Sequence, residues 1–351
     1  MITCEEIYDL HTTGALESAL CEAYREIPLD SRNSMRKNDT PLHMACAFAD
    51  ENAVRILLER GADVNVRNDD GDTPLCVLAK RKCCGKETTI AGIAGLLVSK
   101  EARVPRSGKN TTALIEAVGN RHFLMADILL MSGCRIDSTN SNGNNVLHVI
   151  CQSAGDIAYD IKRTKERIAD FSERWYSEKD KREAYENMEY LEEADRQCFL
   201  TAKRILENGQ IDTEDKNNIG KTALDIAWET GARRIGALLS GQDPDTDELS
   251  ALIGGLDVFQ ALWYKDMIAL DAILRSGTEL QTVCEDKKLY DFKGRSPLAC
   301  ALLWDNAEAA EMLLRSGADP DFKDLEEQTA FAVWLLSLIH ISEPTRRVVI
   351  S

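Results

Sequence analysis

The chain has 351 residues, of which 44% are hydrophobic and 29% are charged, a balance typical of globular proteins. Its formal net charge is −17, so the chain as a whole repels phosphate backbones, and we expect no nucleic-acid partner. No apolar run approaches the length of a membrane-spanning helix, and the N-terminus lacks a basic stretch followed by an apolar core. We therefore expect no membrane partner and a cytoplasmic or nuclear protein.

The 11 cysteines are expected to be reduced thiols in those compartments. They include no Cys-x-x-Cys pair and no histidine at metal-ligand spacing, so the sequence predicts no metal site. The adjacent pair Cys83 and Cys84 lies among basic residues that could lower a thiol pKa; a redox role for it is the less favoured interpretation. Phosphate-binding loops, nucleophile elbows and zinc-protease motifs are absent from the sequence, so we expect neither catalysis nor a cofactor.

A repeated pattern from Asn38 onward decides the fold. Residues 38–65 read NDTPLHMACAFADENAVRILLERGADVN, and the opening recurs along the chain. One residue, threonine or a substitute, marks each copy: Thr40, Thr73, Thr112, Asn145, Thr222, Ser296 and Thr329. Three of the spacings between these positions equal 33 residues and one is 39. The spacing of 77 contains an insertion, and the spacing of 74 hides one further copy.

Each copy predicts two short helices followed by a hairpin loop. Thr40 can cap the first helix, and Pro41 fits its first turn, where a missing N–H costs nothing. Gly61 is expected to end the second helix in the left-handed conformation. Because so short a copy cannot bury its apolar face alone, its stability must come from stacking on its neighbours.

Two copies depart from the pattern in ways that predict local weakness. Lys100 occupies the position of Gly61 in the second copy, where a left-handed backbone would cost a non-glycine residue about 1 kcal/mol. The hidden copy ends in the leucine–glycine pattern at Gly277, but its opening, expected near Leu256, is lost. We expect these copies to be the weakest in the stack.

This period, with a TPLH opening, paired leucines and a GADVN ending, resembles the ankyrin repeat. The resemblance covers residues 38–335 except for one insertion, and residues 1–37 look like a degenerate repeat acting as a cap. It implies an all-α fold, an ankyrin-repeat α-solenoid with short β-hairpin fingers. It also implies that His43 and His148, which share one position, form hydrogen bonds within their repeats; a role as general base or metal ligand is the alternative.

Residues 155–196 form a charged insertion in the copy that opens at Asn145. The segment has no proline and is rich in helix formers, with Ile168, Phe171 and Trp175 at helical spacing. It predicts a helical hairpin, or one extended helix pair, that projects from the array. We favour a self-packed structural insert whose aromatic rings cover one another, and the alternative is a partner-binding arm.

Residues 336–351 do not continue the pattern. Their first part, LSLIHISEPTR at 336–346, resembles a translated transposase adaptor from sequencing libraries. We therefore expect an adaptor-derived tail, and a gene that continues after Leu335 with more repeats, a cap or a catalytic domain. A strand-like tail is the alternative.

The resemblance implies a non-catalytic protein-binding scaffold or adaptor, and we expect a monomer that binds other proteins. Phe48 and Trp304 share one position on the concave side, where an exposed ring is a typical interface anchor. The alternatives are a regulatory or substrate-recruiting array of an enzyme whose catalytic domain is missing, an acidic decoy or inhibitor, and a structural spacer. The candidate contact residues on the fingers are Arg36, Lys37, Asp69, Asp70, Asp72, Ser141, Asn142, Asn144, Asn218, Lys221 and Arg295.

Overall fold

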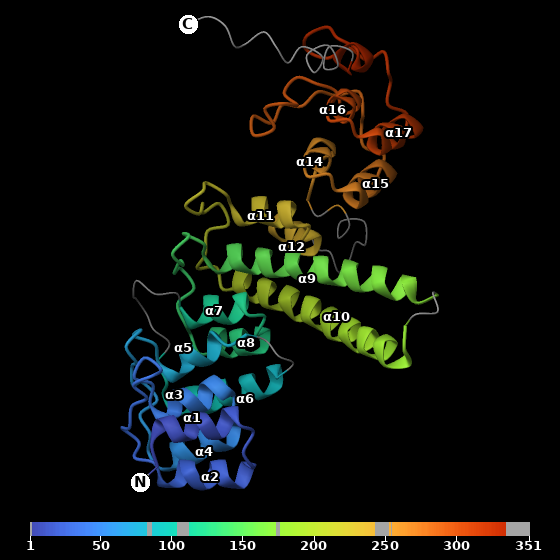
Figure 1. Ribbon diagram of the computed structural model, residues 1–351. Coiled ribbons are helices and arrows are strands. Elements are labelled where there is room, and N and C mark those ends of the chain that lie inside the picture. The colour runs from blue at the N-terminus through green and yellow to red at the C-terminus, as the bar shows by residue number, and fades with distance from the viewer. Residues whose placement is uncertain are drawn as a thin grey trace, which may run out of the picture. The chain divides into compact units, whose positions relative to one another are not determined.

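The computed structural model describes residues 2–82, 86–103, 112–172, 176–242, 253 and 255–334. These residues form helices joined by loops, and the only β-type pairing among them consists of two isolated bridges, Asn33 with Asp39 and Cys284 with Lys293. The fold is therefore all-α. The chain divides into two compact units, Met1–Ile226 and Ala227–Ser351 (Figure 1).

The first compact unit is a stack of helix pairs (Figure 1). Its helices are α1 (Cys4–Thr12), α2 (Glu17–Glu26), α3 (Pro41–Phe48), α4 (Glu51–Glu59), α5 (Pro74–Ala79), α6 (Glu87–Ser99), α7 (Ala113–Gly119), α8 (Phe123–Met131), α9 (Val146–Ala169), the 3-10 turn η1 (Asp170–Ser172) and α10 (Glu178–Glu207). The first helices of the pairs, α1, α3, α5, α7 and α9, pack on one another in one row, and the second helices pack in another. Each helix thus contacts both its own partner and its equivalents in the neighbouring repeats.

The second compact unit repeats this arrangement. Its helices are α12 (Arg233–Leu239), α14 (Val258–Trp263), α15 (Met267–Arg275), α16 (Pro297–Leu303) and α17 (Ala307–Arg315), while α11 (Ala223–Thr230) crosses the boundary between the units. First helix α14 packs on first helix α16, and second helix α15 packs on second helix α17. Leu270, Phe292 and Leu313 lie fully buried in the core between them.

The repeat openings begin helices as predicted. In each, a side-chain oxygen accepts the backbone N–H three residues on, which satisfies one of the donors that a helix start leaves free. The capping residues are Thr40, Thr73, Thr112, Asn145, Thr222 and Ser296. The prediction of a helix start at each of these positions is confirmed.

The hidden repeat keeps an opening, so the prediction that it was lost near Leu256 was wrong. Helix α14 begins after Asp257, whose carboxylate accepts the backbone N–H of Gln260 at 2.7 Å. The side chain of Gln260 in turn accepts the backbone N–H of Asp257. Aspartate caps a helix as well as threonine does, but here Val258 replaces the proline, so the pattern was not recognisable in the sequence.

The strain predicted at Lys100 falls on the next residue. Lys100 has an ordinary φ of −97°, whereas Glu101 has a φ of 60° and takes the place of Gly61, whose φ is 86°. The register is fixed by equivalent backbone bonds, from Ala62 to Leu57 and from Ala102 to Leu97. The sequence alignment was therefore off by one residue, because α6 ends one residue later than the leucine pattern suggested.

The segment 155–196 belongs to one extended helix pair, the second of the two predicted forms, and not to a separate hairpin. Helix α9 continues the first helix of its repeat, and α10 runs from Glu178 into the second helix, so the repeat's own two helices extend outward (Figure 1). We call the projecting part, residues 155–196, the helical arm. The ring of Phe171 packs edge-on against Tyr176 and Tyr185 at centroid distances of 5.0 and 6.2 Å. Trp175 and the predicted tail, 336–351, lie outside the described residues.

His43 and His148 link each repeat to the next. The ring nitrogen Nδ1 of His43 accepts the backbone N–H of its own capping residue, Thr40, at 3.2 Å. Its Nε2 therefore carries the hydrogen and donates to the backbone carbonyl of Asp72, in the next repeat, at 2.9 Å. The Nε2 atom of His148 lies 3.0 Å from the carbonyl oxygen of Lys221, which is in the next repeat. The predicted bond within the repeat is confirmed, and the bond to the next repeat adds a connection that the sequence did not indicate.

The first prediction concerns the charge state of His43. Burial lowers its pKa from the ordinary 6.5, so the folded chain holds the neutral ring and the unfolded chain binds the proton more readily. Stability that is present above pH 6.5 should therefore be lost as the pH falls through the lowered pKa. We expect urea unfolding of His43→Gln to lose less stability than the wild type between pH 7.5 and about 5. Glutamine is the natural choice because Gln260 holds this position in its own repeat.

Since other groups titrate in the same range, the difference between the two curves isolates His43. Parallel curves over the whole pH range would contradict the assignment.

Candidate interaction surfaces

The loops that precede each opening, which we call finger loops, are closed by side chains rather than by strands. They include residues 33–39, 63–72, 135–144 and 211–221 in the first unit, and 280–295 and 319–328 in the second. The amide oxygen of Asn217, for example, accepts the backbone N–H groups of Ile219 and Lys221 at 3.1 and 3.0 Å. Asn140 and Asp324 make the same pair of bonds.

The predicted β-hairpins are accordingly not found as strands among the described residues. The amide and carboxylate side chains take the backbone donors that a strand ladder would use. What remains of the hairpin is one backbone bond across the base of the loop, as from Asn68 N to the carbonyl of Asp72.

Neighbouring finger loops are bonded to each other. The backbone N–H of Asp69 donates to the carbonyl of Lys37 at 2.8 Å, and that of Asn218 donates to Asn142 at 3.1 Å. The side chain of Asn218 donates to the carbonyl of Ser141. These predicted contact residues therefore hold one repeat against the next.

The charged finger residues are also paired within the chain. Lys37 and Asp70 form an exposed ion pair at 3.3 Å, which contributes little to stability. Asp72 is buried and paired with Lys80 at 2.6 Å. Arg295 of the second unit lies 2.6 Å from the buried carboxylate of Asp324.

Two further predicted finger residues are held in a similar way. The guanidinium of Arg36 covers the ring of Tyr8, 4.3 Å from its centroid. The amide of Asn144 accepts a hydrogen bond from Asn217 at 2.9 Å. The finger residues whose side chains remain exposed are Arg36, Lys37, Asp69, Asp70, Ser141, Asn142 and Asn218.

Phe48 is covered by the N-terminal helices rather than free. Its ring stacks on His11 of α1, with centroids 4.1 Å apart and planes 7° from parallel. The ring of Tyr8, also on α1, is tilted by 51° to that of Phe48, with the two ring centroids 5.6 Å apart. Phe48 is therefore a half-buried contact of the capping helix α1, which differs from the exposed anchor that its position predicted.

Trp304 belongs to an aromatic cluster in the second unit, formed by Trp263, Tyr290, Phe292 and Trp304. Trp263 lies 4.8 Å from Trp304 and 5.3 Å from the buried Phe292, measured between ring centroids. Tyr290 meets the edge of Trp263 at 5.6 Å and remains 72% exposed. Both tryptophans are half-buried.

Three members of this aromatic cluster, namely Trp263, Tyr290 and Phe292, were not identified from the sequence. Trp263 lies in the repeat whose opening was not recognised, so its position in that repeat could not be read. Tyr290 lies in the finger loop 280–295, which is longer than the others and has no equivalent position in them. The two aromatic residues within that loop, Tyr290 and Phe292, were the available signal.

Apolar side chains at some fingertips were missed as well. Met35 is 84% exposed and Ile219 is 73% exposed in the first unit. Ile219 occupies the turn position that Asp70 and Asn142 hold in other finger loops. An apolar residue at a turn position was the signal, because turns ordinarily carry polar residues.

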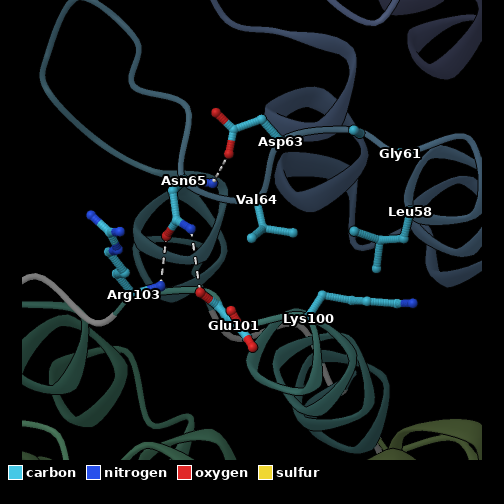
Figure 2. A pocket seen from close by; sticks show the side chains of 9 residues that line it. Leu58, Gly61, Asp63, Val64, Asn65, Lys100, Glu101 and Arg103 are labelled. Atoms are coloured by element: carbon cyan, nitrogen blue, oxygen red, sulfur yellow. Dashed lines mark hydrogen bonds between the residues drawn. The ribbon is translucent and has the colours of Figure 1, made fainter.

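A groove of about 340 Å³ lies where α4 and α6 end (Figure 2). Asn65 spans it: its amide oxygen accepts the backbone N–H of Arg103 at 2.6 Å, and its amide nitrogen donates to the carbonyl of Glu101. Its lining carries both signs of charge, from Asp63 and Glu101 and from Lys100 and Arg103. The groove therefore fits a joint between two repeats better than a site for a charged ligand.

The buried cysteines Cys4, Cys46 and Cys134 lack the lowered pKa of reactive thiols. Burial raises the pKa of Cys4 to about 12 and that of Cys134 to about 11, and it raises the pKa of Cys46 as well. A protonated, buried thiol acts as a small apolar side chain. Cys83 and Cys84, the pair considered for a redox role, lie outside the described residues.

The described ranges contain neither a candidate metal site nor a candidate membrane-spanning helix. No group of three His, Cys, Asp or Glu side chains there is placed to hold a metal ion. None of the helices described is long and apolar enough to cross a membrane.

Parts of the chain are similar to known proteins. Residues 37–69 and 293–325 match the family model for the ankyrin repeat. An ankyrin repeat-containing protein of Schizosaccharomyces pombe is 34% identical over 68 residues, which are 17% of this chain and 33% of that protein. The phosphocholine transferase AnkX of Legionella pneumophila is 26% identical over 201 residues, 54% of this chain and 20% of the transferase. The chain thus matches a third or less of the length of these relatives.

The second prediction tests the closure of the finger loops. Asn217 is buried and makes three hydrogen bonds, two to backbone N–H groups and one to Asn144, so Asn217→Ala should destabilise the chain by about 2 kcal/mol. Its exposed neighbour Asn218 makes one side-chain bond, and Asn218→Ala should cost less than about 1 kcal/mol. Chemical denaturation of both variants measures the two values. Equal losses would show that the amide of Asn217 has no special role.

Proposed function

The chain belongs to the ankyrin-repeat family, and on this premise we propose that it is a non-catalytic scaffold or adaptor whose protein partner docks on the aromatic cluster of the second unit. We further propose that the protein is a monomer located in the cytoplasm or the nucleus. Ankyrin repeats are protein-interaction modules, and this general role is what the family supports. The choice of the aromatic cluster is our own.

The observation that carries the proposal is the exposure of Tyr290 beside two half-buried tryptophans. Tryptophan and tyrosine contribute most to binding energy at protein interfaces, because each buries a large area at a small entropic cost. Trp263 and Trp304 are already fixed by their contacts with Phe292, so little side-chain freedom remains to be lost on binding. The aromatic cluster would therefore lose little side-chain entropy when a partner binds to it.

Charge indicates the kind of partner. The chain carries a net charge of −17, which accelerates association with basic surfaces and slows it with acidic ones. The face of an aromatic ring also attracts a cation, and Lys265 already lies 5.7 Å from the centroid of Trp304. A partner segment with apolar and basic side chains fits both features.

A second candidate function is favoured by one comparison. The alternative is that these repeats regulate an enzyme or recruit its substrate, within a longer protein. The observation in its favour is the match of 201 residues to a phosphocholine transferase, of which they make up only 20%. The full-length transcript separates the two functions, because the alternative requires a catalytic domain in the same chain.

The third prediction tests the aromatic cluster. Tyr290→Ala should reduce capture of the partner about tenfold or more, since truncation of an interface tyrosine typically costs more than 1 kcal/mol. The matched control is Ile268→Ala on α15, which also removes an exposed apolar side chain, 51% accessible, outside the cluster. Quantitative affinity capture with the wild type and both variants measures the effect, after thermal unfolding has shown that each is folded. Unchanged capture by Tyr290→Ala would contradict the proposal.

A further inference from the structure

A cavity of about 450 Å³ lies at the base of the helical arm, between α9, α10 and the turn that joins α7 to α8. Arg121 reaches it from the turn, and Asp160, Arg163 and Arg167 reach it from α9. Asn187 contributes from α10. All of these residues belong to the first compact unit, so one packed body builds the cavity.

The lining of the cavity is basic although the chain is strongly acidic. Three guanidinium groups and one carboxylate give the lining a net charge of +2, against −17 for the whole chain. The carboxylate, Asp160, is already paired with Arg121 at 2.9 Å. Within the described part of the chain, no hydrogen bond or ion pair holds the guanidinium of Arg163 or Arg167.

Arg163 and Arg167 are both exposed on the surface of α9. Arg163 and Arg167 are four residues apart on one helix, so their like charges face the same side and repel each other. The carboxylate of Asp180 interacts with Arg167, but the lowering of its pKa comes chiefly from Ser177, which donates two hydrogen bonds to it. The two arginines therefore keep their capacity to bind an anion.

Neutral donors lie beside the arginines. The amide nitrogen of Asn187 donates to the hydroxyl oxygen of buried Thr164 at 3.2 Å. The Thr164 hydroxyl oxygen thus already accepts one hydrogen bond, and the hydroxyl can still donate its hydrogen to a ligand. A hydroxyl and an amide next to guanidinium groups suit a ligand with several acceptor oxygens.

We propose that this cavity binds the phosphate group of a phosphate monoester. Guanidinium groups bind phosphate oxygens in pairs of parallel hydrogen bonds, and a monoester carries close to two negative charges at neutral pH, which matches the net charge of the lining. The cavity is larger than one phosphate ion, which leaves room for the carbon part of an ester. The site is independent of the aromatic cluster, and its test does not depend on the proposed function.

The fourth prediction is the titration of the whole chain with O-phosphoserine, with inorganic phosphate and with sodium chloride at matched ionic strength. Calorimetry should show saturable binding of phosphoserine that chloride does not reproduce. The double variant R163Q/R167Q should bind at least about tenfold more weakly, because it removes the charged donors. R163Q alone should lie between the two, and circular dichroism reports whether each variant is folded.

The matched control is K162Q/K165Q, which removes two positive charges from exposed positions of the same helix that do not line the cavity. It should bind phosphoserine as the wild type does. Tighter binding of phosphoserine than of inorganic phosphate supports an ester as the ligand, and equal binding would overturn that assignment in favour of the free anion. Absence of binding above the chloride background, or equal weakening in both double variants, would overturn the proposal.

Discussion

The structure depends on the burial of apolar helix faces between neighbouring repeats. Helices α3 and α4 have 8 and 9 residues, and isolated helices shorter than about 12–15 residues are marginal in water. Leu57 of α4 nevertheless has no exposed surface, because α2 and α6 cover the helix from both sides. No repeat can do this alone, so the repeats are stable only as a stack.

The same constraint explains the polar side chains at each joint. Stacked helices bring helix starts and loop carbonyls into contact away from water, where an unpaired polar group costs about 1–3 kcal/mol. The capping residue, the histidine that bonds the next repeat and the asparagine of the finger loop satisfy these groups. Predicted contact residues such as Asp72, whose carbonyl accepts the bond from His43, therefore help to hold the stack together. The sites that we propose for ligands, Tyr290 with its tryptophans and the arginines of the helical arm, lie outside these joints.

The sequence predicted what depends on local rules and missed what depends on contacts across repeats. The helix starts at Thr40 and Asn145 each depend on a hydrogen bond between the capping side chain and the backbone N–H three residues on. The spacing of residues in the sequence was therefore enough to predict them. Asp257 also caps its helix, but it departs from the threonine–proline pattern and was therefore not recognised. Glu101 rather than Lys100 has the left-handed backbone, because backbone hydrogen bonds and not the leucine positions set the register of that repeat. The coverage of Phe48 by His11 and the approach of Arg121 to α9 join residues far apart in the chain, and no spacing rule reports them.

Hydrogen exchange on a Leu57→Ala variant tests the stack most directly. Removal of this buried side chain should cost about 2–5 kcal/mol. If no repeat is stable without its neighbours, amide exchange in α2 and α6, which pack on α4 but contain no changed residue, should accelerate as much as exchange in α4 itself. Acceleration confined to α4 would contradict the account, since it would show that each helix pair keeps its structure independently of the repeats beside it.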